Sequence, residues 1–108
     1  MSEKITIKQV LELKGKRKIT MLTAYDYPLG SLVDQAGIDM ILVGDSLANV
    51  VLGLDSTTKV GMNEMIIFAK AVTRAVKHAL VVGDMPFESY QLNPQESVKN
   101  AKRFVEEA

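Results

Sequence analysis

The sequence predicts an α/β fold that is built on a small parallel sheet. Three short apolar runs, residues 19–24, 40–43 and 79–82, have the composition of buried strands. A segment with apolar residues at helical spacing follows each run. Because strands that alternate with helices form parallel sheets, the order of one helix and then three strand–helix units indicates this class.

The first predicted helix begins after Thr6, which forms a capping box with Gln9. Gly15 suits the left-handed cap at which such a helix ends. The run at residues 19–24 follows directly and is rich in β-branched and apolar residues, so it is predicted to be the first strand.

The second predicted helix begins at Asp26 and Pro28 and ends at Gly37. The run at residues 40–43 is wholly apolar, as in strands that are covered on both faces. Residues 47–59 show no clear period, so this segment is expected to be a loop.

Two longer helices complete the prediction. Apolar residues at helical spacing predict one helix over residues 62–76, and the third strand is expected at residues 79–82. Asn93 and Pro94 form a strong helix start, and the apolar face of the last helix reaches Ala108.

The composition excludes several classes of protein. The chain is 47% hydrophobic and 24% charged, with 13 basic and 13 acidic residues, so it is neither disordered nor strongly charged. No basic footprint for nucleic acid or a membrane surface is present, and the run at residues 14–18 is expected to be a solvated loop. There is no cysteine, which excludes disulfides and thiolate metal sites and agrees with an expected cytoplasmic location.

The chain is expected to be part of a larger domain. Three parallel strands alone leave two open edges and a poorly covered core. A complete (β/α)8 barrel, or TIM barrel, needs about 250 residues. Residues 1–108 are therefore interpreted as a single partial domain, which comprises an N-terminal helix and the first three strand–helix units of such a barrel.

Two aspartates carry the strongest chemical signal. Asp45 and Asp84 each follow a buried strand and a glycine, so both are expected at the carboxyl-end face where parallel α/β folds bind ligands. Glycine in front of each aspartate lets the backbone turn sharply and approach a ligand. Two carboxylates on neighbouring strands suit a hard cation such as Mg²⁺, because it prefers oxygen ligands and leaves positions open for a substrate.

A plainer interpretation of these aspartates remains open. Asp45 and Asp84 also suit helix caps or turns, and Asp26 is assigned mainly to capping. Ser46 is a candidate donor to a substrate oxygen, whereas the only histidine, His78, is expected to be a solvent-exposed residue near the end of a helix. The sequence has no glycine-rich phosphate loop and no serine-elbow motif.

Four segments in register resemble the ketopantoate hydroxymethyltransferase family, and the resemblance runs from about Lys14 to Ala108. These segments are Thr23-Ala24-Tyr25-Asp26, Leu42-Val43-Gly44-Asp45-Ser46-Leu47, Gly53 with Asp55-Ser56-Thr57, and Asp84-Met85-Pro86-Phe87. Three positions depart from the usual family pattern, and none of them is a proposed ligand. They are Ala48, Gly61, which weakens a helix cap, and Phe68.

The resemblance implies a barrel of the phosphoenolpyruvate/pyruvate superfamily type. It also implies transfer of a hydroxymethyl group from 5,10-methylenetetrahydrofolate, the co-substrate, to 3-methyl-2-oxobutanoate, giving 2-dehydropantoate in pantothenate and coenzyme A biosynthesis. By this likeness Asp45 and Asp84 bind Mg²⁺, and Asp45, Ser46 and Asp84 contact the keto acid. The reaction would proceed through an enolate that the metal stabilises.

The family resemblance places the general base, a third carboxylate and a lysine beyond Ala108, so the chain alone is expected to be inactive. It also implies ring-like homo-oligomers, for which Ile67 and Phe68 are candidate contact residues. Two rival functions remain. One is another Mg²⁺-dependent, enolate-forming lyase of the same superfamily, acting on phosphonopyruvate or isocitrate, and the other is a structural or assembly module without chemistry.

Overall fold

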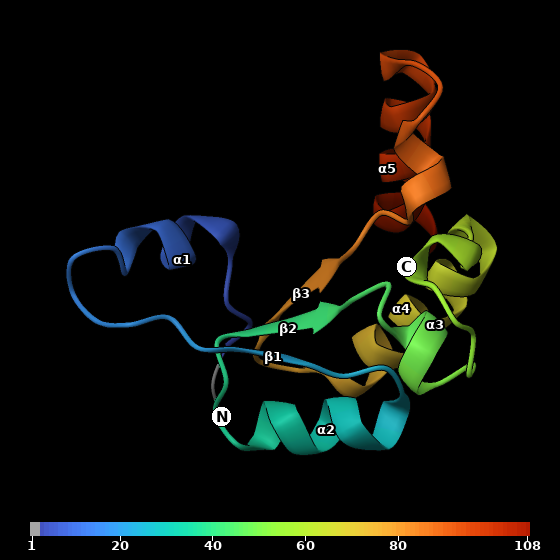
Figure 1. The fold of residues 1–108 in the computed structure, drawn as a ribbon. Coiled ribbons are helices and arrows are strands. Elements are labelled where there is room, and N and C mark those ends of the chain that lie inside the picture. Colours follow the sequence, from blue (N-terminus) through green and yellow to red (C-terminus); the bar gives the residue numbers. More distant parts are fainter. Residues whose placement is uncertain (1–2) are drawn as a thin grey trace.

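A computed structural model describes residues 3–108 and contains one three-stranded parallel sheet (Figure 1). The strands are β1 (Met21–Thr23), β2 (Met40–Val43) and β3 (Leu80–Gly83), in the order β1-β2-β3. Both pairs are parallel. The predicted α/β class with a parallel sheet is therefore confirmed.

Five α-helices and two 3₁₀ turns accompany the sheet in residues 3–108. They are α1 (Ile7–Glu12), α2 (Tyr27–Gln35), α3 (Leu47–Val50), η1 (Thr57–Lys59), α4 (Met62–Ala75), η2 (Phe87–Tyr90) and α5 (Pro94–Glu107). The predicted caps of three helices are confirmed, because the side chains of Thr6, Asp26 and Asn93 accept backbone N–H groups of the first turns of α1, α2 and α5. None of the helices among the described residues is long and apolar enough to cross a membrane.

Helices α2 and α4 pack against each other and against β2, on the opposite side of the sheet from α1 (Figure 1). Gly30 of α2 permits their close approach, since a Cβ there would lie 3.4 Å from side-chain atoms of both Val72 and Ala75. Ile41 and Val43 of β2 are fully buried in the core that these helices form with the sheet. This packing anchors β2 in the core.

The remaining elements leave apolar surface uncovered. All three residues of β1 are exposed. Helix α5 follows β3 and projects beyond the sheet (Figure 1). A groove of about 580 Å³ lies between α1, β3 and α5, although Phe104 of α5 packs against the core. The groove is lined mainly by apolar residues, among them Val10, Val82 and Phe104.

The structure differs from the sequence-based expectations in several local details. The predicted loop at residues 47–59 contains α3 and η1, which are too short to show a hydrophobic period. The first helix ends at Glu12, before Gly15, although Gly15 does have a positive φ of 80°. Phe68, a candidate for a subunit contact, is half-buried and packs against the core, whereas Ile67 is exposed.

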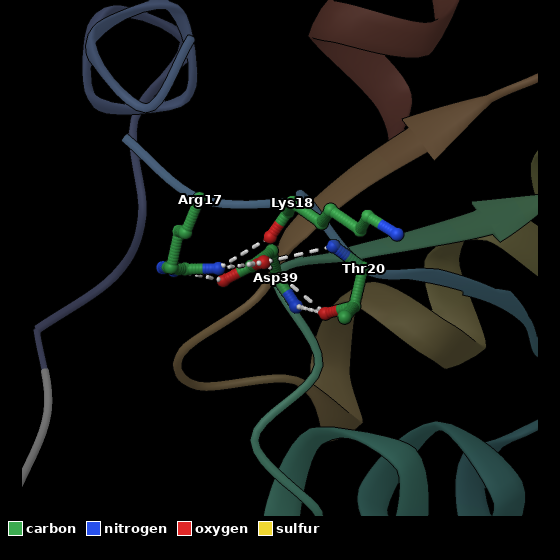
Figure 2. A network of polar contacts seen from close by, with 4 residues as sticks. All are labelled: Arg17, Lys18, Thr20 and Asp39. Carbon is green, nitrogen blue, oxygen red and sulfur yellow. Dashed lines mark hydrogen bonds and ion pairs between the residues drawn. The ribbon is translucent and has the colours of Figure 1, made fainter. Parts of the chain in front are cut away.

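The basic run at residues 14–18 is exposed and lies outside the helices and strands, as predicted, and Arg17 in it pairs with Asp39 just before β2 (Figure 2). Two guanidinium nitrogens of Arg17 each lie 2.8 Å from a carboxylate oxygen of Asp39. The backbone N–H of Thr20 donates to the same carboxylate, over 2.9 Å. Asp39 is buried, so this network fastens the segment before β1 to the amino-terminal end of β2.

Candidate functional site

Polar side chains from all three strands meet at the carboxyl ends of the sheet. Tyr25 lies two residues after β1, Asp45 and Ser46 follow β2, and Asp84 directly follows β3. Parallel strands bring their carboxyl ends to one edge, so residues far apart in the sequence become neighbours. The predicted placement of Asp45 and Asp84 at a common edge agrees with this geometry.

A direct hydrogen bond joins the two aspartates. The backbone N–H of Asp45 donates to Oδ2 of Asp84 over 3.0 Å. The backbone N–H of Asp84 in turn donates to the carbonyl oxygen of Val43, also over 3.0 Å, and so extends the pairing of β3 with β2. The position of the Asp84 carboxylate is thus set by the backbone that carries Asp45.

The charges at this edge are not balanced by a cationic side chain hydrogen-bonded to either aspartate within residues 3–108. Burial of the Asp45 carboxyl group, followed by the negative charge of Asp84, raises the pKa of Asp45 above its ordinary value. A cation bound between the two groups would remove this repulsion.

The donor atoms fit a hard divalent ion in part. Both aspartates offer carboxylate oxygens, the ligand type that Mg²⁺ prefers. Residues 3–108 contain no cluster of three or more acidic, histidine or cysteine side chains arranged for a metal. Asp45 and Asp84 could thus supply at most two carboxylate ligands, and an octahedral ion held by them would keep several positions for water and a substrate.

Ser46 occupies the N-cap position of α3 but makes no capping hydrogen bond. Its hydroxyl oxygen instead lies 2.5 Å from the phenolic oxygen of Tyr25. Ser46 is half-buried and directly follows Asp45 in the chain, so it belongs to the same carboxyl-end edge of the sheet.

The structure gives a packing reason for one of the two glycines that precede the aspartates. Neither Gly44 nor Gly83 has a positive φ, so no sharp left-handed turn is present. A Cβ on Gly83 would lie 2.8 Å from the ring of Phe104, whereas one on Gly44 would meet nothing closer than 3.5 Å. Gly83 is therefore needed to admit the Phe104 side chain of α5.

Two other candidate residues lie outside this site. Asp26 caps α2, as predicted, through a 2.9 Å hydrogen bond from the N–H of Leu29. His78 precedes β3 and thus lies at the opposite edge of the sheet. It is half-buried rather than solvent-exposed, because its Nδ1 donates to the carbonyl oxygen of Glu3 over 2.9 Å.

Tyr25 is the site residue to which the sequence pattern assigned no role. The signal was present, since Tyr25 comes just after a predicted strand and within a family-like segment. Its partner Ser46 is 21 positions away, however, and only the parallel pairing of β1 with β2 brings the two together.

Comparisons with known proteins identify a family that this chain resembles. The model of the ketopantoate hydroxymethyltransferase family matches residues 4–108. A 3-methyl-2-oxobutanoate hydroxymethyltransferase of Syntrophomonas wolfei is 63% identical over 95 residues, which cover 88% of this chain and 34% of the relative. The corresponding protein of Syntrophobacter fumaroxidans is 55% identical over 108 residues, or 100% of this chain and 38% of the relative.

A relative of the same name from the archaeon Pyrococcus furiosus is 53% identical over 102 residues, covering 94% of this chain and 36% of that protein. The chain therefore spans little more than a third of the length of the curated relatives it matches.

Proposed function

The chain belongs to the ketopantoate hydroxymethyltransferase family, and from this we propose that it forms the N-terminal part of an enzyme with that activity. The enzyme would transfer a hydroxymethyl group from 5,10-methylenetetrahydrofolate to 3-methyl-2-oxobutanoate and so make 2-dehydropantoate for pantothenate and coenzyme A synthesis. Residues 1–108 would supply the N-terminal helix and the first three strand–helix units of a TIM barrel in a cytoplasmic homo-oligomer.

One observation supports this proposal above all others. The 3.0 Å hydrogen bond from the Asp45 N–H to Asp84 Oδ2 keeps two acidic residues, 39 positions apart, at the carboxyl ends of neighbouring strands. This edge is where parallel α/β folds bind their ligands. Burial of the Asp45 carboxyl group, and after it the negative charge of Asp84, raises the pKa of Asp45, and a bound cation would offset both effects.

In the proposed site, Asp45 and Asp84 hold Mg²⁺ and Ser46 binds the keto acid. The ion, when bound, supplies positive charge that polarises the keto group and acidifies the adjacent C–H bond. Ser46 directly follows Asp45 at the same edge of the sheet, and its hydroxyl group would donate to an oxygen of the substrate. The proton is removed by a base from the part of the enzyme that follows residue 108.

A chimera provides the test. In it, this chain replaces the matched segment of the Syntrophobacter fumaroxidans relative, to which it is 55% identical over 108 residues. We expect the chimera to form 2-dehydropantoate from 3-methyl-2-oxobutanoate and methylenetetrahydrofolate, and to lose this activity when Mg²⁺ is chelated. Cleavage of phosphonopyruvate or isocitrate without hydroxymethyl transfer would instead assign the chain to a lyase.

The 108-residue chain itself is the matched control. We expect no detectable transfer and only weak Mg²⁺ binding, because residues 3–108 offer two carboxylate ligands at the site and no third. Robust turnover by the chain alone would contradict the assignment of the base to a later segment. An inactive chimera that folds like the parent relative would favour a purely structural module.

A further inference from the structure

The Tyr25–Ser46 hydrogen bond connects the first strand to the proposed substrate site. Tyr25 comes directly after Ala24, whose buried backbone N–H donates to the carbonyl oxygen of Leu42 over 3.1 Å. The Tyr25 ring packs against the core. Both the backbone and the ring are therefore fixed, so the phenolic oxygen has a defined position 2.5 Å from Ser46 Oγ.

Ser46 has no other hydrogen-bond partner for its hydroxyl group within residues 3–108. It lies at the N-cap of α3, where a serine commonly accepts a backbone N–H, yet no such bond is formed. Among these residues, Tyr25 is therefore the one that orients the Ser46 hydroxyl group.

We infer that Tyr25 is a positioning residue, which orients the Ser46 hydroxyl group to donate a hydrogen bond to the carboxylate of the keto acid. This inference rests on the proposed function. A phenol is a better hydrogen-bond donor than an aliphatic alcohol, so the Tyr25 hydroxyl group donates to Ser46 Oγ. The serine proton is then directed away from Tyr25 and is available to a ligand. A carboxylate can only accept, which makes it the matching partner.

Without the phenolic hydroxyl group, the serine would be free to rotate and to donate to the carboxylates of Asp45 or Asp84, which lie at the same edge. Substrate binding would weaken, while the metal ligands and the base would be unaffected. The effect should therefore appear in the dissociation constant and the KM of the keto acid, and much less in kcat.

A double-mutant cycle in the chimera tests this inference. Tyr25→Phe keeps the ring that packs against the core and removes only the hydroxyl group. We expect Tyr25→Phe to raise the Kd of 3-methyl-2-oxobutanoate, measured calorimetrically with Mg²⁺, by roughly three- to tenfold, as for the loss of one hydrogen bond. Ser46→Ala should have at least this effect, and adding Tyr25→Phe to Ser46→Ala should change nothing further.

The matched control is Tyr27→Phe, which removes the same hydroxyl group from an exposed tyrosine on the first turn of α2 and should leave Kd unchanged. Unchanged binding in Tyr25→Phe, or a second loss when it is added to Ser46→Ala, would overturn the positioning role. If the unmodified chimera binds no keto acid, the proposed function itself fails and this inference fails with it.

Discussion

Asp84 accepts a hydrogen bond through one carboxylate oxygen and also repels Asp45, and a substitution can separate these two effects. Asparagine keeps an oxygen that accepts the Asp45 N–H but has no charge. We expect Asp84→Asn in the chimera to reduce Mg²⁺-dependent transfer more than about 100-fold. Substitution of a residue that only supports a metal ligand already lowers metal affinity or activity by about 10–100-fold, and loss of a direct ligand should cost more.

The same variant should keep nearly the stability of the parent when metal is absent. Asparagine weakens the hydrogen bond from the Asp45 N–H but also removes the like charge beside Asp45, so the two effects oppose each other and thermal unfolding in a chelator should shift little. Asp26→Asn is the control, since this strand-end aspartate only caps α2 and asparagine caps equally well. Near-normal activity in Asp84→Asn would remove Asp84 from the metal site.

The buried carboxylate of Asp39 makes stability depend on pH. Hydrogen bonds from Arg17 and then from the backbone of Thr20 hold the pKa of Asp39 well below its usual range. The pKa of Asp39 in the folded protein lies below its unfolded value of about 3.9. The stabilisation that the ionised carboxylate provides is therefore complete above pH ~3.9 and is lost as the pH falls below that value.

Asp39→Asn should therefore destabilise the chimera at pH 7 by roughly 1–3 kcal/mol, since hydrogen bonds to a charged group are lost. The stabilities of parent and variant should converge as the pH falls below about 4, in urea unfolding at a series of pH values. Asp55→Asn is the matched control, because Asp55 pairs with Lys59 at the surface, where its side chain is 79% exposed. An equal loss from both variants would refute the special role of Asp39.

At the scale of elements, the contact between β3 and α5 depends on glycine at position 83, because glycine has no side chain. A Cβ at Gly83 would lie 2.8 Å from Cδ1 of Phe104, so either the ring or the helix must move. We expect Gly83→Ala to destabilise the chimera by about 1–3 kcal/mol, as overpacking does, and Phe104→Leu in the same chain to restore most of this loss.

Thermal unfolding measures this effect, and Gly44→Ala is the matched control. The same added methyl group at Gly44 meets its nearest neighbours at 3.5 Å, an ordinary contact distance. Equal destabilisation by the two alanine substitutions would show that loss of glycine flexibility, rather than the Phe104 contact, is responsible.

At the scale of the whole molecule, the sheet formed by residues 3–108 has two unpaired edges and much uncovered apolar surface. Met21 and Leu22 of β1 are 43% and 50% exposed, and the groove beside β3 has a volume of about 580 Å³. Open strand edges and apolar patches of this kind favour association.

The isolated chain should therefore bind a hydrophobic dye such as anilinonaphthalene sulfonate and self-associate at micromolar concentration, whereas the chimera should do neither to the same extent. Light scattering after size-exclusion chromatography measures the mass of the species in solution, and dye fluorescence measures the exposed apolar surface. A monomeric, dye-negative chain would show that these surfaces are better covered than the structure indicates.

Much of the fold was predictable because its signals are local. The caps formed by Thr6, Asp26 and Asn93 and the three apolar strands were identified from neighbouring residues, and the structure confirms them. The short α3 and η1 were missed, because three or four residues are too few to establish a period.

The candidate site was predictable in part. Asp45 and Asp84 could be assigned to one edge because the rule for parallel strands applies to any α/β sequence. The partner of Arg17 and the contact between Tyr25 and Ser46 could not be predicted, since each joins residues about 20 positions apart through the lateral pairing of strands.

The sequence by itself determined the class of the fold, the family and the positions of the two aspartates relative to their strands. These properties depend on the order and spacing of residues along the chain. Only the tertiary structure decided that Asp84 is held by the backbone of Asp45, that Tyr25 holds Ser46, and that Gly83 makes room for Phe104. The physical reason is that such contacts depend on strand register and helix docking, to which residues distant in the chain contribute together.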